Sequence, residues 1–489
     1  MQQNELPEGW IVTEVSNIGD IITGKTPPKE DKTLFGGEIP FFKPSDLNKG
    51  YFVESSQDSL TKKGLEYVRM LPPLTVMVTC IGATIGKAGL SRVEGTTNQQ
   101  INSIVTRQDK ISPKWLYHVF TSEWMQSEIQ QRSSVTTLPI INKSRFSKLP
   151  IPIPPLPEQH RIVAAIEALF ARLDATNERL DRVPGIMKTF RQAVLAAACD
   201  GRLTEDWRKE NPSVKNSDDY LREVIDFRIK CSKKDELKFE NISELDLCDL
   251  SELPDSWLWV PSNVIFSYVT SGSRGWAKYY SDAGSIFLRI GNLDRNSIYL
   301  QLKDIQRVTP PDNAEGKRTR IQKDDILVSI TADIGSIGYI CEELGDAYIN
   351  QHIALARPVQ NLNPKYIAYF LHSQTGGKKQ FEKLHRGATK IGLGLDDIRS
   401  IAVPLPPLPE QQEIVRRVDA LFDFADSIEA KVAVAREKTE RLRQSILSKA
   451  FSGELVPTEA ELARQEGREY ESAEKLLERI KREGKSSKK

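Results

Sequence analysis

Cysteine and metal-binding patterns are scarce in this chain. Its 489 residues include five cysteines, none arranged as a CxxC pair, and five histidines without the spacing of metal ligands. Such cysteine usage argues against a disulfide framework and against the common zinc motifs, and it is typical of a reducing compartment. We therefore expect no metal site, and we expect His160, at the start of a helix, to be solvated.

Long hydrophobic runs are also absent. No apolar stretch approaches the length of about 20 residues that a membrane-spanning helix needs, and Met1–Glu5 does not begin a signal peptide. Apolar residues make up 39% and charged residues 28% of the chain, as in soluble globular proteins. Because the chain is too long for a single hydrophobic core, we expect several domains in a cytoplasmic protein.

The chain has little net charge. The formal value of +1 gives no sign of nucleic-acid binding. The distribution is uneven, however, because residues 200–252 are acidic whereas residues 1–157 and 253–409 are mildly basic. The two basic stretches permit contacts with phosphate groups without demonstrating them.

Catalytic motifs are missing as well. The sequence contains no GxSxG, HExxH or GxGxxG motif, no adenine-methyltransferase motif of the Asp-Pro-Pro-Tyr type, and no helicase or nuclease signature. Gly82–Ala88 resembles a phosphate-binding loop, but it has three residues between its glycines and Ala88 at the magnesium-binding position. Its counterpart in the second half has Ser336 in place of the lysine, which favours a turn between strands. We expect no catalytic residues and no cofactor bound by this chain.

What the sequence does contain is one long pattern written twice. Pro154-Pro155-Leu156-Pro157-Glu158-Gln159 returns as Pro406-Pro407-Leu408-Pro409-Glu410-Gln411. At the same offset, Ala168-Leu169-Phe170 returns as Ala420-Leu421-Phe422, and Arg191-Gln192 as Arg443-Gln444. A repeat of about 250 residues is too long for a solenoid unit and indicates duplication of a domain with its helix.

Each copy of the motif predicts a long helix. Pro157 and Pro409 suit the first helical position, where the missing N–H costs nothing, and Glu158 and Glu410 place negative charge at the helix start. Apolar residues then recur three and four apart, at Ile162, Ile166, Leu169, Leu173, Leu180 and Val183, and at Ile414, Val418, Leu421, Ala425, Ile428 and Val432. One narrow stripe on a rod of about 60 Å requires a partner helix. We expect the two copies to pair as an antiparallel coiled coil about a pseudo-two-fold axis, with a kink at Pro184-Gly185.

The segments around the helices match each other too. Leu6-Pro7-Glu8-Gly9-Trp10 corresponds to Leu253-Pro254-Asp255-Ser256-Trp257, and short β-rich runs with glycine and asparagine turns follow in both halves. Helical segments are predicted at 113–131 and 364–384. The expected fold class is α+β, with two β-rich domains (1–150 and 253–402), two spacer helices (151–200 and 403–453), an acidic connector with a short amphipathic helix (201–252), and a C-terminal amphipathic helix with a basic tail (454–489).

Polar side chains near the predicted strand ends are candidates for reading DNA. Arginine and lysine pair with guanine, and asparagine and glutamine pair with adenine. The candidates are Lys25, Lys43, Ser45, Lys87 and Gln100 in the first half, and Arg274, Arg289, Asn292, Arg318, Arg320, His352 and Lys390 in the second. Because both halves keep Asn98-Gln99 and Asn350-Gln351, we interpret these pairs as structural.

The PPLPEQ helices and the two Leu-Pro-x-x-Trp openings resemble the specificity (S) subunit of type I restriction-modification systems, over nearly the whole chain. Gln192–Leu195 with Gly201–Thr204, and Gln444–Leu447 with Ala450–Leu455, are similar to the subgroup that includes the enterobacterial K and B enzymes. The resemblance implies that the β-rich domains are target recognition domains, each reading one half of an asymmetric bipartite DNA site, and that the helices set the gap.

The resemblance also implies the partners. An S subunit is non-catalytic and binds double-stranded DNA, two adenine methyltransferase (M) subunits that use S-adenosylmethionine, and two restriction/translocase (R) subunits that need ATP and magnesium. The amphipathic stretches Tyr220–Lys230 and Ala473–Arg482 would then contribute to M-subunit docking and close the chain into a ring. Two other functions remain open at this point: a DNA-modifying enzyme that acts alone, and a coiled-coil scaffold that binds only protein.

Overall fold

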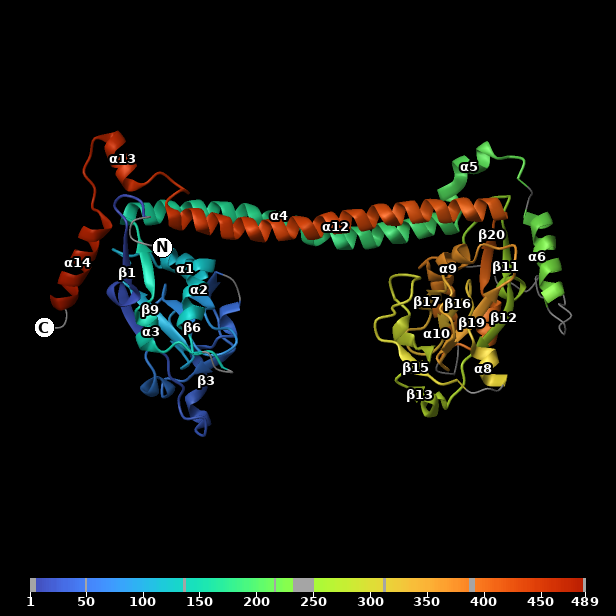
Figure 1. Ribbon diagram of the computed structural model, residues 1–489, viewed down its shortest axis with the longest axis horizontal. Helices are drawn as coiled ribbons and strands as arrows, with labels where there is room; N and C mark the ends of the chain where they lie inside the picture. Colours follow the sequence, from blue (N-terminus) through green and yellow to red (C-terminus); the bar gives the residue numbers. More distant parts are fainter. Residues whose placement is uncertain are drawn as a thin grey trace. The chain divides into compact units, whose positions relative to one another are not determined.

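The computed structural model describes residues 6–48, 51–134, 138–214, 217–231, 250–310, 314–386 and 392–486. It divides into two compact units. Unit 1 comprises residues 1–181 and 433–489, and unit 2 comprises residues 182–432. Each unit therefore contains one sheet-rich domain and a stretch of each long helix (Figure 1). The predicted fold class, α+β with two such domains and a pair of long helices, is confirmed.

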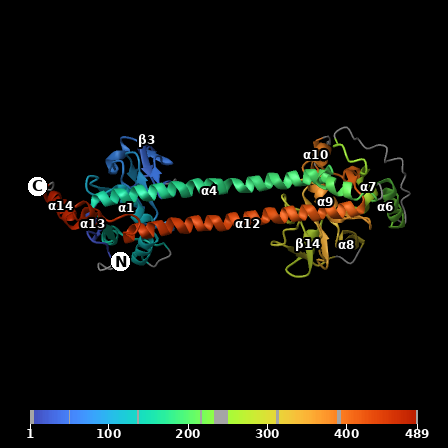
Figure 2. The same cartoon turned by 90° about the horizontal axis from the view of Figure 1, so that it is seen from above.

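The two copies of the motif form the two longest helices. Helix α4 runs from Leu156 to Cys199 and helix α12 from Leu408 to Ser452, so each begins one residue before the predicted proline. The two helices lie side by side in both views (Figures 1 and 2). Pro184 lies inside α4 without ending it, and the kink there stays a prediction.

Ion pairs show that the helices run antiparallel. In unit 1, Arg443 pairs with Asp174, and in unit 2, Arg191 pairs with Asp426. The two arginines occupy the same position of the repeat, and so do the two aspartates, so one ion pair occurs in both units. The Arg191 guanidinium also pairs with Glu429 at 3.0 Å, so it bridges two acidic side chains of α12. In unit 1, Arg436 also pairs with Asp181, so residue numbers fall along α12 as they rise along α4. In unit 2, Arg417 donates to the carbonyl of Leu203, just beyond α4, which gives the same direction, so the predicted antiparallel pairing is confirmed within each unit.

The N-terminal part of each long helix packs on its own sheet-rich domain, whereas the sequence predicted packing on the other long helix. Ile162 and Ile166 are fully buried in the same core as Trp115 of the first sheet-rich domain. Ile414 and Val418 are buried in the corresponding core of the second domain, beside Tyr366. The apolar stripe is therefore not reserved for the partner helix, because near each PPLPEQ motif it anchors the helix to its own domain.

The repeated glutamate of the motif fastens each domain to its helix. Trp10 donates its indole N–H to Oε1 of Glu158 at 2.8 Å, and Trp257 donates to Oε2 of Glu410 at the same distance. Both carboxylates are almost inaccessible to solvent. The predicted role of these glutamates at the helix start thus extends to a buried hydrogen bond with the tryptophan of the Leu-Pro-x-x-Trp opening.

The repeated glutamine makes a second connection. Oε1 of Gln159 accepts a hydrogen bond from the backbone N–H of Ser112 at 2.9 Å, and Oε1 of Gln411 accepts one from Asn363 at the same distance. Ser112 is the N-cap residue of α1 (Pro113–Thr121), and Asn363 is the N-cap residue of α9 (Pro364–His372). Because all these groups are internal, the Glu-Gln pair is retained for the fold and does not face a ligand.

The sheets of unit 1 are mostly antiparallel. The first is a two-stranded sheet of β1 (Ile11–Glu14) and β10 (Pro150–Ile153). The second has the order β2-β9-β6-β7-β4, with bounds Gly19–Thr23, Ile101–Thr106, Val76–Thr79, Ala88–Ser91 and Phe52–Val53. The third has the order β5-β3-β8, with bounds Asp58–Leu60, Phe35–Phe42 and Thr96–Thr97, and its β3–β8 pair is parallel.

Unit 2 repeats this plan. Strands β11 (Leu258–Pro261) and β20 (Ala402–Leu405) form the two-stranded sheet. A second sheet has the order β12-β19-β16-β17, with bounds Phe266–Ser271, Ile353–Pro358, Ile326–Ser329 and Ile337–Tyr339. A third has the order β13-β15-β14-β18, with bounds Tyr280–Ser281, Gln306–Val308, Ser285–Leu288 and Ala347–Ile349, and its β14–β18 pair is parallel.

Each helical segment predicted after the strands is two helices. Helices α1 (Pro113–Thr121) and α2 (Glu123–Arg132) replace the first segment, and α9 (Pro364–His372) and α10 (Gly377–Arg386) replace the second. The break between α1 and α2 falls at Ser122, whose backbone is extended and whose hydroxyl accepts a hydrogen bond from the N–H of Met125. A serine in this role starts a new helix, which the apolar periodicity alone did not reveal.

The short amphipathic pieces are helices that bury part of their apolar side chains in their own units, whereas Ile229 of α6 (Ser217–Cys231) is exposed. In α6, Tyr220, Val224 and Ile225 are buried in the core of unit 2. In α14 (Ala473–Ser486), Ala473, Leu476 and Ile480 are buried in the core of unit 1. These residues are thus used within the chain, and the docking of a partner on the two helices stays a prediction. The side chains of the basic tail at the C-terminal end, residues 484–489, lie outside the described residues.

Candidate nucleic-acid interface

In unit 1, the candidate residues gather where strands end. The backbone N–H of Lys25, just after β2, donates to the carbonyl of Thr97 at 3.0 Å. The N–H of Asn98 donates to the carbonyl of Phe42, the last residue of β3, at 3.1 Å. These bonds bring the segments 24–26, 43–45 and 98–100 together, and the N–H of Cys80 adds the hairpin 80–87 through the carbonyl of Gln100. We call these four segments the strand-end rim of unit 1.

Unit 2 has the same arrangement. The N–H of Asn350 donates to the carbonyl of Leu288, the last residue of β14, at 3.1 Å, and the N–H of Ile330 donates to the carbonyl of His352 at 3.0 Å. The strand-end rim of unit 2 therefore consists of segments 272–274, 289–292, 330–336 and 350–352. By these bonds, Lys43 corresponds to Arg289 and Gln100 corresponds to His352.

One glycine in each rim permits a close approach of two backbones. A Cβ atom on Gly24 would lie 2.1 Å from the carbonyl oxygen of Asn98, and a Cβ on Gly272 would lie 2.3 Å from that of Asn350. Real Cβ atoms do not come so close to an oxygen, so only glycine fits at either position. Both rims are therefore built on the same constraint.

The repeated asparagines support the rims from within. Oδ1 of Asn98 accepts a hydrogen bond from the N–H of Gln100 at 3.0 Å, and Oδ1 of Asn350 accepts one from His352 at 3.1 Å. Both asparagines are buried, in agreement with their interpretation as structural. The glutamines that follow differ, because Gln99 is exposed and Gln351 is half-buried at the surface of its rim.

Five of the residues predicted to contact DNA lie on the rims and have side chains that are accessible to solvent. Lys25, Ser45, Arg274 and Arg289 are exposed, and Lys43 is partly exposed. The Lys43 ammonium makes an ion pair with Asp58 and lies 5.7 Å from the ring centre of Phe41. Among the described residues, no carboxylate lies within ion-pair distance of Arg274 or Arg289. The two rims therefore differ at the corresponding positions 43 and 289, because the Lys43 charge is paired with Asp58 and the Arg289 charge is not paired with a carboxylate of the described residues.

Other predicted residues are held by contacts within the domain. The amide of Asn292 is buried, and it accepts from the N–H of Arg289 and donates to the carbonyl of Gln301, both at 2.9 Å. The Arg318 guanidinium donates to the carbonyl of Ser271 at 2.6 Å and to Oγ of Ser273 at 2.7 Å. These groups shape the rim of unit 2 rather than project from it, so we leave both residues out of the set proposed to contact bases.

Three further candidates, Arg320, His352 and Gln100, each make a contact with another side chain of the same domain. Arg320 is exposed but paired with Asp346. Nδ1 of His352 lies 3.0 Å from Oγ1 of Thr331. Oε1 of Gln100 accepts a hydrogen bond from Nδ2 of Asn98 at 2.9 Å. Lys390 falls outside the described residues.

Lys87 closes a hairpin and not a phosphate-binding loop. The loop connects β6 to β7, which are antiparallel, and the N–H of Lys87 donates to the carbonyl of Thr84 at 3.1 Å. A phosphate-binding loop instead connects a strand to a helix whose N-terminus faces the phosphate. The predicted turn between strands is confirmed, and Lys87 is a partly exposed residue of the rim.

The rims also include polar residues that sequence reasoning did not select. Thr26 donates its hydroxyl hydrogen bond to Gln99, and the amide of Gln351 lies 2.8 Å from Nε2 of His352. Arg295 pairs with Asp333 of the unit 2 hairpin, and this hydrogen bond raises the pKa of Arg295. Gln99 and Gln351 directly follow the structural asparagines, so their position next to a repeated asparagine at the end of a strand was the signal that could have identified them.

The described residues contain no group of three or more histidine, cysteine, aspartate or glutamate side chains arranged to hold a metal ion. Within the same ranges, no helix is long and apolar enough to cross a membrane. The accessible side chains of the rims are basic or hydrogen-bonding groups, which suit contacts with base edges and phosphates.

Comparison with known proteins identifies the family. The family described as the type I restriction modification DNA specificity domain matches residues 7–184 and 286–434. The EcoKI specificity subunit of Escherichia coli strain K12 is 29% identical over 474 residues, covering 93% of this chain and 91% of the relative. The EcoBI specificity subunit of Escherichia coli is 32% identical over 365 residues, covering 73% of this chain and 69% of the relative.

Solved structures show the same fold. A chain from a study of complex assembly and conformational transition of the type I R-M system has a TM-score of 0.60 and 18% identity, and it covers 92% of this chain and 99% of its own length. The HsdS subunit of Thermoanaerobacter tengcongensis has a TM-score of 0.52 and 19% identity, with coverage of 92% and 98%. From the repeated domains, the paired helices and these relatives, we conclude that the chain belongs to the family of DNA specificity subunits of type I restriction-modification systems.

Proposed function

We propose that each sheet-rich domain reads one half of an asymmetric bipartite DNA site through its strand-end rim. The observation that carries this proposal is that both rims share the same buried framework, with Asn98 and Asn350 as braces, but differ at the accessible positions built on it. Lys43 and Arg289 correspond, as do Gln100 and His352. A shared framework with different polar side chains suits two different base sequences.

The set proposed to contact DNA follows from accessibility. In unit 1 it comprises Lys25, Lys43, Ser45, Lys87 and Gln100, joined by Gln99. In unit 2 it comprises Arg274, Arg289, Arg320 and His352, joined by Gln351. Arginine contacts the O6 and N7 atoms of guanine in the major groove, whereas lysines at the edge of a rim suit phosphate contacts. Lys390 remains a proposed contact from its sequence position alone.

The chain acts with partner subunits in this proposal. It recruits two methyltransferase subunits, which bind S-adenosylmethionine and modify adenine, and two restriction/translocase subunits, which bind ATP and magnesium. The chain itself supplies no catalytic group and binds no cofactor. Because its target is cellular DNA and its partners use cytoplasmic nucleotides, its place is the cytoplasm. The role of the paired helices is to set the gap between the two half-sites.

Methylome mapping tests the recognition function. The chain is co-expressed with its methyltransferase subunit, and methylated adenines are located across the host genome by single-molecule sequencing. One asymmetric bipartite motif, with a methylated adenine in each half and a fixed gap, supports the proposal. A stable complex that produces no motif would point instead to a protein-binding scaffold, and methylation by the purified chain alone would establish an independent enzyme.

A deletion in the paired helices tests the spacing function. Residues 174–180 of α4 face residues 437–443 of α12, since the ion pair Asp174–Arg443 joins one end of these segments and the ion pair Asp181–Arg436 lies one residue beyond the other end. Removing seven residues from each shortens the pair by about 10 Å, the rise of about three base pairs. We expect a shorter gap with both half-sites retained, and an unchanged gap would refute the role of the helices as a ruler.

A further inference from the structure

Side-chain amides lie on both strand-end rims, at Gln99 and Gln100 in unit 1 and at Gln351 in unit 2. An amide accepts hydrogen bonds at its oxygen and donates them at its nitrogen. When one end is bonded within the protein, the other end is left to contact a ligand. The orientation of each amide therefore decides which edge of a base it can bind.

In unit 1, the backbone fixes the orientation of the Gln100 side chain. The backbone N–H of Gln100 can only donate, and it donates to Oδ1 of Asn98 at 3.0 Å. The nitrogen of the Asn98 amide must then point to the other side, where it donates to Oε1 of Gln100 at 2.9 Å. Asn98 is buried, so this arrangement is held within the domain. The oxygen of Gln100 is thus occupied, and its nitrogen is left as a donor.

The neighbouring Gln99 has the same orientation. Its Oε1 atom accepts a hydrogen bond from the hydroxyl of Thr26. Gln99 is exposed and Gln100 is half-buried, and among the described residues the side-chain nitrogen of neither has a hydrogen-bond partner. The two amides of the unit 1 rim therefore present donors.

In unit 2, the amide of Gln351 is bonded at its other end. Its Nε2 atom lies 2.8 Å from Nε2 of His352, and Nδ1 of His352 lies 3.0 Å from Oγ1 of Thr331. An amide nitrogen only donates, so Nε2 of His352 accepts, and the ring hydrogen is on Nδ1, facing the threonine. Oε1 of the half-buried Gln351 is accessible and has no hydrogen-bond partner among the described residues. This amide therefore presents an acceptor together with its second N–H.

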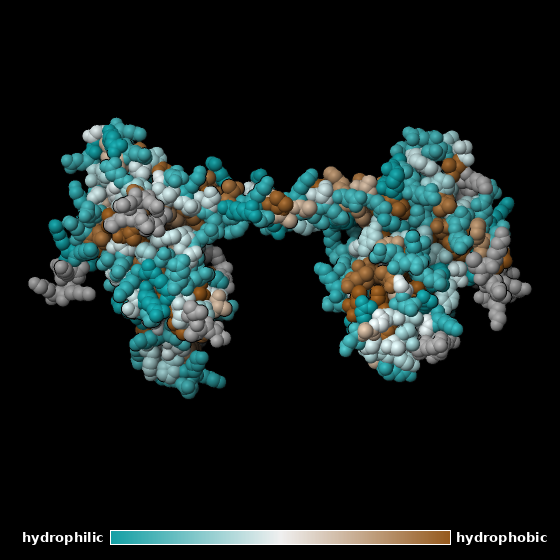
Figure 3. Space-filling view, in the orientation of Figure 1, coloured by the Kyte–Doolittle hydropathy of each residue, from teal (hydrophilic) through white to brown (hydrophobic). Residues whose placement is uncertain are grey.

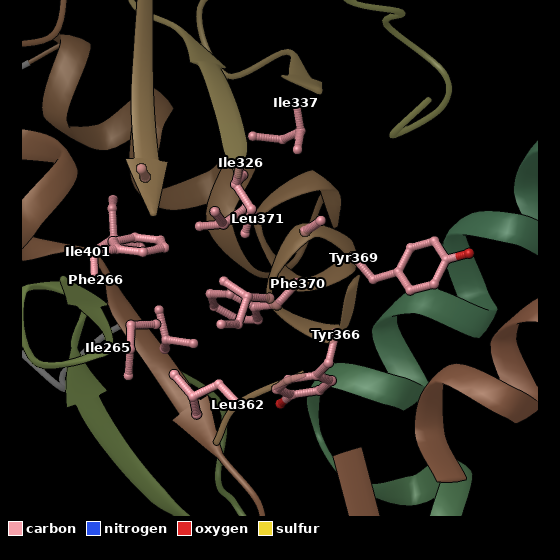
Figure 4. Packing of buried hydrophobic residues seen from close by; sticks show 14 of the residues in the cluster. Ile265, Phe266, Ile326, Ile337, Leu362, Tyr366, Tyr369, Phe370, Leu371 and Ile401 are labelled. Atoms are coloured by element: carbon pink, nitrogen blue, oxygen red, sulfur yellow. The ribbon is translucent and has the colours of Figure 1, made fainter. Parts of the chain in front are cut away.

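The turn that carries Gln351 is anchored in the core of unit 2. It leads directly into β19, and Thr331 follows β16, the neighbouring strand. Figure 4 shows Ile326 of β16 beside Leu371 of α9, and both residues belong to the same buried cluster. Because both strands are held in this core, the side chains at their ends are favoured in one arrangement before DNA binds, which lowers the cost of binding.

The surface of each unit is suited to recognition through hydrogen bonds. Hydrophilic residues cover most of the face of each unit that Figure 3 shows, and hydrophobic residues form separate patches. In the major groove, guanine presents two acceptors, O6 and N7, whereas adenine presents the acceptor N7 and the donor N6. Two amide donors match guanine better than thymine, which has a single acceptor beside its methyl group. An amide that offers both an oxygen and an N–H matches adenine.

We propose that Gln99 and Gln100 of unit 1 donate to O6 and N7 of a guanine, whereas Gln351 of unit 2 accepts from N6 and donates to N7 of an adenine. This assignment rests on the proposed function, which supplies the DNA. Thr331 is a positioning residue, because it acts on Gln351 through His352. Both halves of the chain keep the glutamine, and its neighbours decide which base it reads.

Substitution of glutamine by glutamate tests the assignment, because a carboxylate of the same size replaces the outward N–H donor by an acceptor. Gln99→Glu and Gln100→Glu are made in unit 1, and Gln351→Glu in unit 2. The controls Gln108→Glu and Gln360→Glu add the same charge at exposed glutamines beyond the opposite ends of β9 and β19. The full chain, assembled with its methyltransferase subunits, selects from duplexes with randomised half-sites, and the bound DNA is sequenced.

We expect each unit 1 variant to lower the preference for guanine about tenfold at one G·C pair of one half-site. Gln351→Glu should change one A·T pair of the other half-site, where cytosine is then accepted as well as adenine, because both bases carry an amino group that donates to a carboxylate. The controls should leave the selected motif unchanged. Circular dichroism checks folding, and Gln99→Glu, at an exposed residue, decides for unit 1 if Gln100→Glu does not fold.

Several outcomes overturn the assignment. They are an affected A·T pair in the first half-site, an affected G·C pair in the second, and a motif that no variant changes. If the wild-type complex selects no bipartite motif at all, the proposed function fails together with the assignment, so the two failures are distinguishable.

Thr331→Val tests the positioning role, because it removes the hydroxyl that faces Nδ1 of His352 and keeps the shape of the side chain. The ring hydrogen is then free to move to Nε2, which would turn the oxygen of Gln351 inward and its nitrogen outward, as in unit 1. We expect the preference for adenine over guanine at the pair that depends on Gln351 to fall about tenfold. An unchanged preference, or a loss of affinity that is equal for all four bases, overturns this role.

Discussion

Trp257 donates its indole N–H to a carboxylate oxygen of Glu410 at 2.8 Å, across 153 positions of the sequence. The same carboxylate accepts hydrogen bonds from the Thr204 hydroxyl at 2.7 Å and from the Arg208 guanidinium at 2.5 Å. Three elements of unit 2 thus meet at one buried side chain: the start of the domain, the start of α12 and the segment that follows α4. The repeated tryptophan and glutamate of the sequence are retained because they hold these elements together.

Replacing this carboxylate should destabilise unit 2. Glu410→Ala leaves the Trp257 N–H and the Arg208 guanidinium without their acceptor, and breaking a buried pair in this way costs about 3–5 kcal/mol. Urea unfolding, with hydrogen exchange to locate the loss in unit 2, provides the measurement. The control is Asp396→Ala, because the Asp396 side chain is 97% exposed and should contribute less than about 1 kcal/mol. Equal effects of the two substitutions would contradict the role of Glu410.

The buried histidine of unit 1 should make stability depend on pH. Burial, together with the nearby charges of Lys114 and Arg443, lowers the pKa of His118 to about 3. Between pH 6.5 and about 3, the unfolded chain binds a proton at this residue that the folded chain does not, so stability falls as the pH decreases, by up to about 1.4 kcal/mol per pH unit. His118→Phe should remove this contribution. Urea unfolding of both proteins from pH 7 to pH 4 tests the expectation, which fails if their difference in stability is constant.

The two corresponding basic residues of the rims should not contribute equally to DNA binding. Arg289→Ala should weaken binding to the cognate site by about 1–3 kcal/mol, the value of a bidentate contact with guanine, and should relax specificity in one half-site only. Lys43→Ala should have a smaller effect, because Asp58 already neutralises this ammonium. Fluorescence anisotropy of the assembled complex, at one fixed salt concentration, measures both. Similar losses would show that the ion pair with Asp58 opens on binding.

The exposed basic residues next to the rim glycines should contact phosphates. Removing one phosphate contact, with Lys25→Gln or Arg274→Gln, should weaken binding to all sequences alike and reduce the slope of log K against log salt by about 1. Titrations at several salt concentrations with cognate and unrelated duplexes give the slope. A loss confined to the cognate duplex would instead assign the residue to base recognition.

The close approach at Gly272 should be intolerant of any side chain. Gly272→Ala would place a methyl group 2.3 Å from the carbonyl of Asn350 and should displace the segment 350–352, weakening cognate DNA binding at least tenfold, about 1.4 kcal/mol. Gly291→Ala is the control in the same rim, because no atom lies within 4 Å of its added Cβ. DNA binding that survives Gly272→Ala unchanged would show that the rim does not carry recognition.

The duplication, the two long helices and their antiparallel pairing follow from the sequence alone, because a proline-led motif and an apolar stripe at helical spacing are local signals that survive in both copies. It also determined the family, since the PPLPEQ helices and the Leu-Pro-x-x-Trp openings recur together. The interpretation of Asn98 and Asn350 as structural needed only the observation that both halves keep them.

Only the tertiary structure decided which polar residues face outward. The sequence does not distinguish Asn292 and Arg318 from Arg274 and Arg289. In the structure, the side chains of Asn292 and Arg318 are held by hydrogen bonds within the domain, whereas those of Arg274 and Arg289 are exposed. Those bonds join residues far apart in the chain, and no local pattern encodes them. The burial of Tyr220, Val224 and Ile225 of α6 and of Ala473, Leu476 and Ile480 of α14 depends in the same way on long-range packing.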